Sequence, residues 1–234
     1  CDKNEACQQL DFSDPRISVI LGDINTDSVE NRIKETQAEF DIIIDDGSHH
    51  SADIIESFSR YFKYLKSGGY YIIEDLHASY WDSFNGGLHN PYSALAFLKK
   101  LSDIINFEHW RLNQSRRNLL SHYEQKYGIT FDEIELSRIH SVIFSNSLCI
   151  ITKRQPDKNQ LGRRVVVGSK EIVSQDYKKF DGTSIHDLTF KVEDNSHLSE
   201  FFLIDQNKEL SETVKDRKDT ISALNQEIHK EKEE

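Results

Sequence analysis

The sequence contains no methionine, only three cysteines and no long apolar run. Because Cys1, Cys7 and Cys149 are an odd and scattered set, they argue against a disulfide framework and favour a reducing, cytoplasmic location. No stretch of 18 apolar residues is present, so we expect no transmembrane helix, and the first residues show no signal-peptide pattern. The lack of methionine, with a start in what resembles mid-domain sequence, predicts a fragment of a longer protein.

Positive charge is also scarce. The chain has 29 lysines and arginines against 40 aspartates and glutamates, which gives a net charge of −11. Surfaces that bind nucleic acids or anionic membranes nonspecifically are basic, so this balance argues against both kinds of partner. The hydrophobic fraction of 37% is low, but the polar residues concentrate toward the C-terminus. We therefore expect the core to form in the first part of the chain.

Apolar segments in the first 75 residues alternate between strand and helix patterns. Residues 40–44 form an apolar run without strict alternation, which predicts a strand buried on both faces. Similar strands are predicted over 17–21 and 70–73. A helix that Asp27 caps is predicted over 27–37, and an amphipathic helix over 51–65 that ends at the Gly68-Gly69 pair. This order predicts a doubly wound, Rossmann-like α/β fold with a mostly parallel sheet.

The rest of the chain divides into three parts. Helices over 91–106 and 115–127, the latter stopped by Gly128, and an antiparallel hairpin over 139–151 complete an α/β domain of residues 1–153. A polar extension follows over 154–197, and a charged helix or coiled-coil linker over 198–234.

A heptad pattern supports the coiled coil, but a solvated charged helix has the same composition. The interruptions at Asn207, Arg217 and Glu231 keep both interpretations open. The apolar heptad positions are Leu203, Leu210 and Leu224 on one side and Val214, Ile221 and Ile228 on the other.

Carboxylates follow each predicted strand, at the sheet edge where doubly wound folds place their sites. Asp46 follows the strand over 40–44, and Glu74 and Asp75 follow the next one. Three carboxylates suit a hard cation such as Mg²⁺ or Mn²⁺, and they repel one another unless a cation or protons neutralise them. The alternative is that these aspartates only cap helices and turns.

Two further groups of residues at this edge have an expected chemistry. His49 can accept a proton near neutral pH, as a general base does. Zinc binding by His49 and His50 is less well supported, because adjacent side chains point in different directions, and we expect a structural role for His50. Asp2 and Asp23, at two further strand ends, suit hydrogen bonds to the ribose and adenine of a nucleoside; simple strand-end turns are the alternative.

Several segments together resemble consecutive motifs of class I S-adenosylmethionine-dependent methyltransferases. These are CDKNEAC, VILGDI, FDIIIDDGSHH, LKSGGYYIIEDLHASYW and IHSVIFSNSLCII. More narrowly, they resemble the metal-dependent sugar O-methyltransferases of macrolide biosynthesis, the macrocin and mycinamicin type. The resemblance covers roughly residues 1–153, and the pair IDDGSH and IEDL is its most specific part. The family's first strand and glycine-rich loop, which cradle the methionine part of the cofactor, are not found.

The resemblance implies transfer of a methyl group from S-adenosylmethionine to a sugar hydroxyl of a glycan or glycosylated natural product, with Mg²⁺ or Mn²⁺ bound. It also implies a role for each residue of the site. Asp46, Glu74 and Asp75 would hold the metal, His49 would be the base, Asp2, Asp23 and Asp45 would bind the cofactor, and Tyr80 and Trp81, in the loop over 76–90, would contact the sugar. The C-terminal helix would suit a homo-oligomer contact or a linker to a fused glycosyltransferase domain.

Two other classes of function stay open at this stage. An aspartate-rich strand end also holds the metal of nucleotide-sugar glycosyltransferases. A non-catalytic Rossmann-like scaffold, whose contacts are made by the coiled coil, is the third hypothesis.

Overall fold

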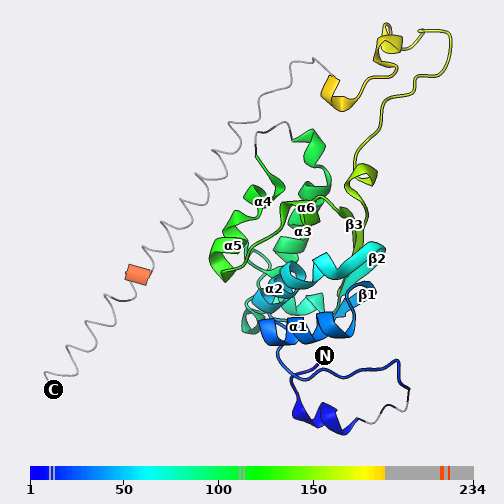
Figure 1. The fold of residues 1–234 in the computed structure, drawn as a ribbon. Helices are drawn as coiled ribbons and strands as arrows, with labels where there is room; N and C mark the ends of the chain where they lie inside the picture. The colour runs from blue at the N-terminus through cyan, green and yellow to red at the C-terminus, as the bar shows by residue number, and fades with distance from the viewer. Residues whose placement is uncertain are drawn as a thin grey trace, which may run out of the picture. The chain divides into compact units, whose positions relative to one another are not determined.

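The computed structural model describes residues 1–187 except 11, 13, 111 and 113, together with 217, 218 and 221. Its contacts divide the chain into two units, Cys1–His109 with Asn113–Leu188, and Trp110–Leu112 with Thr189–Glu234. The first unit contains the sheet and the packed helices (Figure 1). The predicted coiled coil lies outside the described residues, except that Arg217, Lys218 and Ile221 are helical and exposed.

The sheet has four strands in the order β1-β2-β4-β3. They are β1 (Phe40–Asp45), β2 (Leu65–Ile73), β3 (Ile139–Ser145) and β4 (Leu148–Lys153). β1 and β2 are parallel, whereas β4 runs antiparallel to both of its neighbours. The predicted hairpin is thus confirmed, but the described sheet is mixed rather than mostly parallel.

No strand forms at the predicted position 17–21. A single parallel bridge joins Asp2 to Leu21. It is made by the Asp2 N–H, which donates to the Ile20 carbonyl at 3.1 Å, and by the Gly22 N–H, which donates to the Asp2 carbonyl at 2.9 Å. This bridge keeps Asp2 and Asp23 near each other.

The helices before and after β1 end at different residues from those predicted. Thr26, not Asp27, is the N-cap of α1 (Asp27–Thr36). Helix α2 (Ser51–Tyr61) ends earlier than expected, so the Gly68-Gly69 pair lies within β2 and does not cap the helix. A Cβ on Gly69 would lie 2.6 Å from the Asp41 carbonyl oxygen, so the close approach of β2 to β1 requires a glycine there.

Four helices and eight 3₁₀ turns complete the described secondary structure. The predicted helix over 115–127 is divided at Leu120, which is fully buried, and ends at Gly128 as predicted. The helices are α3 (Ala94–Ile105), α4 (Arg116–Leu119), α5 (Ser121–Tyr127) and α6 (Glu133–Leu136). The 3₁₀ turns are Glu5–Gln9, Phe62–Tyr64, Leu76–Tyr80, Asp82–Phe84, Phe107–His109, Pro156–Lys158, Tyr177–Phe180 and Ile185–Asp187.

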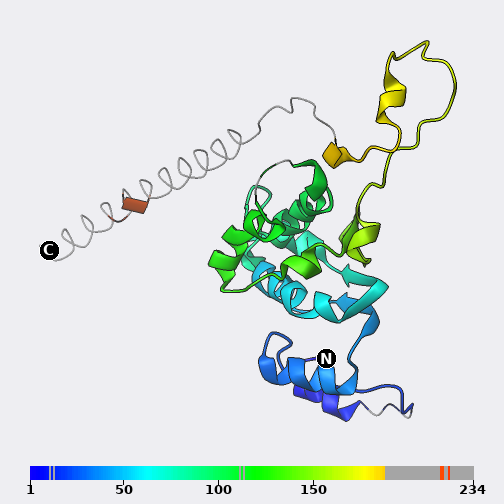
Figure 2. The ribbon, with the colours of Figure 1, turned by 45° about the horizontal axis from the view of Figure 1, so that its top comes forward.

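The core lies between one face of the sheet and helices α2 and α3, which both views show on the same side of the strands (Figures 1 and 2). Tyr71 and Ile73 of β2 and Ile151 of β4 are buried on this face. The ring of Phe58 packs edge-on against the rings of Tyr71 and Phe97, with 5.5 Å between centroids in each pair. These aromatic contacts fix helices α2 and α3 against β2.

The opposite face of the sheet is open among the described residues. Ile42 and Ile44 of β1 are 55% and 57% exposed. Tyr70, which pairs with Ile42, and Ile143 of β3, at the other edge of the sheet, are also exposed. The prediction that β1 is buried on both faces was therefore wrong for this part of the chain, because helices cover only one side of it.

Cys1, Cys7 and Cys149 are all free thiols. Burial raises the pKa of Cys149 to about 12. Among the described residues, no helix combines the length and the apolar character needed to cross a bilayer.

A buried lysine joins the end of β4 to the α2–β2 connection. Lys153 is 2% exposed, and its ammonium donates to the carbonyl oxygens of Phe62 and Lys63 at 2.9 and 3.0 Å. It also lies 2.7 Å from the Glu135 carboxylate. Burial lowers the pKa of Lys153, but these three acceptors compensate the ammonium for lost water.

We predict that Lys153→Met lowers the free energy of unfolding by about 2 kcal/mol, because it leaves buried acceptors without a donor. Urea denaturation followed by circular dichroism measures the change. Lys158→Met is the control, because the Lys158–Asp157 pair is exposed and should contribute under about 1 kcal/mol. Equal effects of the two changes would contradict a structural role for the buried ammonium.

Candidate functional site

The site lies where β1 and β2 end side by side. Since the two strands are parallel and Asp45 pairs with Ile73, the residues that follow both strands meet at one edge. The Glu74 N–H donates to the Asp45 carbonyl at 3.0 Å, which extends the pairing by one residue. Asp46 then follows β1 and Asp75 follows β2, as predicted from their positions in the sequence.

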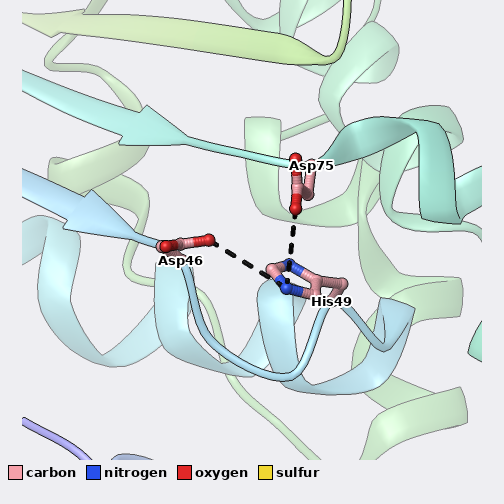
Figure 3. Close-up of side chains that lie close together, drawn as sticks. All are labelled: Asp46, His49 and Asp75. Carbon is pink, nitrogen blue, oxygen red and sulfur yellow. Dashed lines mark ion pairs between the residues drawn. The ribbon is translucent and has the colours of Figure 1, made fainter.

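His49 lies between these two carboxylates (Figure 3). Its Nε2 atom is 4.0 Å from an Asp46 oxygen and 3.9 Å from an Asp75 oxygen. The side chain of His49 is 24% exposed, whereas those of Asp46 and Asp75 are 60% and 51% exposed. The structure thus brings together three of the predicted site residues from two separate loops.

Two of the three residues have an unusual backbone conformation. His49 and Asp75 have φ angles of 60° and 52°, in the left-handed region that residues other than glycine rarely adopt. Such conformations cost free energy and are concentrated at functional sites. In His49 and Asp75 they aim the side chains at the gap between the strand ends, as Figure 3 shows.

The donor atoms of this cluster fit a divalent cation. One atom each from Asp46, His49 and Asp75 lies within 4.8 Å of the others, which is a separation that a shared ion can bridge. Carboxylate oxygens suit Mg²⁺ and Mn²⁺, and the imidazole nitrogen is a suitable ligand for several transition metals. Glu74 is half-buried and is not one of the three clustered residues, so its role as a ligand stays a prediction.

Beside the cluster, an acidic pocket brings together the residues predicted to bind a cofactor. Asp2, Asp23 and Asp45 line it, and so does Asp46 of the cluster. Sequence analysis missed three polar residues of this pocket, Asn25, Ser48 and Asp53. The Ser48 hydroxyl donates to the Asp53 carboxylate, and the Asn25 amide donates to the Asp53 carbonyl at 3.2 Å. Ser48 lies within the Asp-Asp-Gly-Ser-His-His run, whereas Asp53 had no such signal.

The aspartates of the pocket differ in their electrostatics. Burial raises the pKa of Asp45 to about 6, although hydrogen bonds from Ser57, Tyr71 and the Gly47 N–H oppose the shift. By contrast, the hydrogen bond that the Asn4 N–H donates lowers the pKa of the Asp2 carboxyl. Ionisation of Asp45 therefore costs the fold free energy, whereas the hydrogen bond from Asn4 favours the ionised form of Asp2.

We predict that Asp45→Asn stabilises the metal-free protein above pH 7. With a carboxyl pKa of 3.8 in the unfolded chain and about 6 in the folded one, the native state binds more protons between these values, so stability falls as pH rises through them. The variant lacks this loss. Above pH 7 its free energy of unfolding should exceed that of the wild type by up to about 3 kcal/mol, since one pKa unit corresponds to about 1.4 kcal/mol.

Urea denaturation in EDTA between pH 3.5 and about 8 checks this prediction. The difference between the two proteins should disappear near the acid end of this range, where the carboxyl is protonated in both states. A variant that is destabilised at all pH values would contradict the assignment.

The loop over 76–90 forms an aromatic wall beside the cluster. The Trp81 ring lies edge-on to the His77 ring at 4.9 Å and 5.9 Å from the Phe84 ring. Phe84 in turn lies 5.1 Å from the His50 ring, and His50 Nδ1 is 3.3 Å from the Asn85 side-chain oxygen. His50 therefore faces this loop, in agreement with its expected structural role.

Tyr80 and Trp81, the residues predicted to contact a sugar, are 47% and 51% exposed, so their side chains are open to a ligand. His77, to which the sequence analysis assigned no role, lies beside the cluster, with Nδ1 3.8 Å from an Asp75 oxygen. Its position two residues after Asp75 was the feature of the sequence that could have indicated its place beside the cluster.

Curated proteins that are similar to part of this chain include three sugar O-methyltransferases. The chain is 40% identical over 97 residues to the mycinamicin VI 2''-O-methyltransferase of Micromonospora griseorubida, a match that covers 40% of this chain and 24% of that enzyme. It is 43% identical over 81 residues to the L-olivosyl-oleandolide 3-O-methyltransferase of Streptomyces antibioticus, covering 33% and 21% of the two chains. These matches confirm the resemblance to sugar O-methyltransferases.

A third relative acts on a different glycoside. The chain is 36% identical over 91 residues to the 8-demethyl-8-alpha-L-rhamnosyl tetracenomycin-C 2'-O-methyltransferase of Streptomyces olivaceus, covering 38% and 24% of the two chains. The matches with these three relatives thus span between 21% and 24% of the relatives' length.

The chain is also similar to a solved structure, whereas it matches no family model. The solved structure of MycE methyltransferase from the mycinamycin biosynthetic pathway, in complex with Mg and SAH, superposes with a TM-score of 0.48 at 25% identity, covering 69% of this chain and 36% of that one. No protein-family model matches the chain.

Proposed function

We propose that this protein is an S-adenosylmethionine-dependent and divalent-metal-dependent O-methyltransferase that acts on a sugar hydroxyl of a glycosylated small molecule. The identities with three sugar O-methyltransferases support the reaction class over a glycosyltransferase or a scaffold. These relatives act on sugars attached to macrolide and tetracenomycin aglycones, which supports a glycoside as the acceptor.

The observation that carries the proposal is the position of Asp46. Its carboxylate belongs to the Asp46–His49–Asp75 cluster, and the same residue lines the acidic pocket with Asp2, Asp23 and Asp45. A candidate cation site and an acidic pocket that share Asp46 support the binding of a methyl donor beside the acceptor. The methyl donor and the acceptor hydroxyl would therefore be bound next to each other at this edge.

We assign the carboxylates of the pocket to the cofactor. Asp2 would accept hydrogen bonds from the ribose hydroxyls, and Asp23 would bind the adenine side. Asp45, at the junction with the cluster, would be the third cofactor-binding residue. The negative potential of these aspartates favours a ligand that carries a positively charged sulfonium.

His49 is the proposed base, with Asp46 and Asp75 on either side of its Nε2 atom. These two carboxylates, with Glu74, would hold the metal, and they orient the imidazole that removes the proton of the acceptor hydroxyl. When bound, the cation would supply the positive charge that lowers the pKa of that hydroxyl, and the cofactor would supply the methyl group. His49 would hold the proton of the acceptor hydroxyl after the transfer, for which S-adenosylmethionine would supply the methyl group and its thioether the leaving group.

The acceptor sugar would lie against Tyr80 and Trp81, whose exposed rings can pack on the apolar face of a pyranose. Both belong to the loop that begins immediately after Asp75, so they are close along the chain to this residue of the cluster.

We predict that Asp46→Asn abolishes binding of Mn²⁺ and lowers methyl transfer to below about 1% of the wild-type rate, because an ion contributes several kcal/mol to such a reaction. Isothermal titration with Mn²⁺, and transfer of radiolabelled methyl to a panel of macrolide glycosides and rhamnosides, measure the two effects. Asp41→Asn is the matched control, since Asp41 is an exposed aspartate at the other end of β1. Full activity of the wild-type protein in excess EDTA would contradict the metal requirement.

We also predict that His49→Ala lowers turnover by about 10²- to 10⁴-fold but leaves Mn²⁺ affinity nearly unchanged, as expected for a base and not a ligand. His140→Ala, an exposed histidine that hydrogen-bonds Asn159, serves as the control. A parallel loss of Mn²⁺ affinity in His49→Ala would show that His49 is instead a ligand.

A further inference from the structure

The turn between β3 and β4 contacts the segment that follows Asp75. The carbonyl of Ser147 accepts a hydrogen bond from the Leu76 N–H at 3.1 Å. Its hydroxyl accepts a second one from the His77 N–H at 3.4 Å and lies 2.7 Å from His77 Nδ1. One residue of a hairpin turn, 70 positions further along the chain, thus makes three polar contacts with the two residues after Asp75.

These contacts stabilise a backbone that would otherwise be unfavourable. Asp75 is in the left-handed region, with φ of 52°, and so is Ser147, with φ of 62°. Neither residue is a glycine, so each conformation requires support from its surroundings. The Ala78 N–H donates to the Asp75 carbonyl at 3.0 Å, and the Ser147 contacts support the next two residues.

His77 connects this support to the carboxylate itself. Its Nδ1 atom is 2.7 Å from the Ser147 hydroxyl and 3.8 Å from one Asp75 oxygen, while the other Asp75 oxygen faces His49. The edge of the His77 ring also packs against Trp81, which limits its rotation. Which of Ser147 Oγ and His77 Nδ1 donates depends on the tautomer of His77, and the tautomer with the proton on Nδ1 directs that N–H toward both the Ser147 hydroxyl and the Asp75 oxygen.

We propose that Ser147 and His77 are positioning residues that hold the Asp75 carboxylate toward Asp46 and His49, so that the β3–β4 turn sets the affinity of this edge for a divalent cation. We name this pair the Ser147–His77 clamp. The inference rests on the proposed function, because the proposed role of Asp75 is to hold the ion. It makes the turn between the last two strands of the sheet a determinant of the affinity for a divalent cation. The comparisons above assign no such role to this turn.

The test measures Mn²⁺ binding to the purified 234-residue chain by the electron paramagnetic resonance signal of the free ion. Ser147→Ala should weaken binding about tenfold, which is typical for loss of a residue that orients a metal ligand. His77→Ala should have a similar effect, and the double variant should be no weaker than either single one, because the two residues act as one unit. Ser145→Ala, an exposed serine of the same hairpin, is the control.

Thermal melts distinguish positioning from general destabilisation. In EDTA, Ser147→Ala should melt somewhat below Ser145→Ala, because it loses the hydroxyl contacts with His77. The test is therefore the rise in melting temperature that Mn²⁺ causes in each variant, which should be smaller in Ser147→Ala than in Ser145→Ala. Normal binding by the unaltered protein with equal affinities in Ser147→Ala and Ser145→Ala would overturn the clamp alone. Absence of binding by the unaltered protein would overturn the metal site and the clamp together.

Discussion

The parallel pairing of β1 with β2 is the constraint on which the site depends. It places Asp45 opposite Ile73, so the loops that follow both strands start from the same edge. Asp46, His49 and Asp75 gather there only because the two strands end level with each other. A register shift of one residue would reverse which face each side chain occupies and would separate the carboxylates.

The packing of the sheet protects this register. The rings of Phe58, Tyr71 and Phe97 form an aromatic cluster between the sheet and helices α2 and α3. Lys153 connects β4 to the turn that leads into β2 through carbonyls of Phe62 and Lys63. Both contacts fix β2 from the core side, and β2 carries Asp75 at its end. The sheet edge that carries the candidate site is therefore supported by a packed strand. The aromatic residues beside it belong to the loop over 76–90.

The sequence allowed the general α/β architecture to be predicted, and also the position of Asp46, His49 and Asp75 at one edge of the sheet. The apolar run before Asp46 and the spacing to Asp75 identified two neighbouring strand ends, since such patterns report local periodicity and chain order. The open face of β1 was not predictable in this way, because an apolar run says nothing about which helices cover it. Likewise, the position of Gly69 within β2 depends on its distance from Asp41, a contact between strands.

The proposed role of Ser147 in positioning Asp75 shows a second limit of prediction from the sequence. No motif marks a serine in a hairpin turn as part of a site 70 residues earlier. Only the strand order, which places β4 beside β2, brings that turn to the edge. His77 could have been suspected from its distance of two residues from Asp75, but its partner could not.

The central claim is that the strand ends of β1 and β2 hold a divalent cation. The most direct test is the anomalous scattering of crystals grown with Mn²⁺. We predict a peak at about 2.1 Å from oxygens of both Asp46 and Asp75, the distance typical of hard cations of this size. A well-ordered edge without such a peak, or a peak bound by other residues, would contradict it.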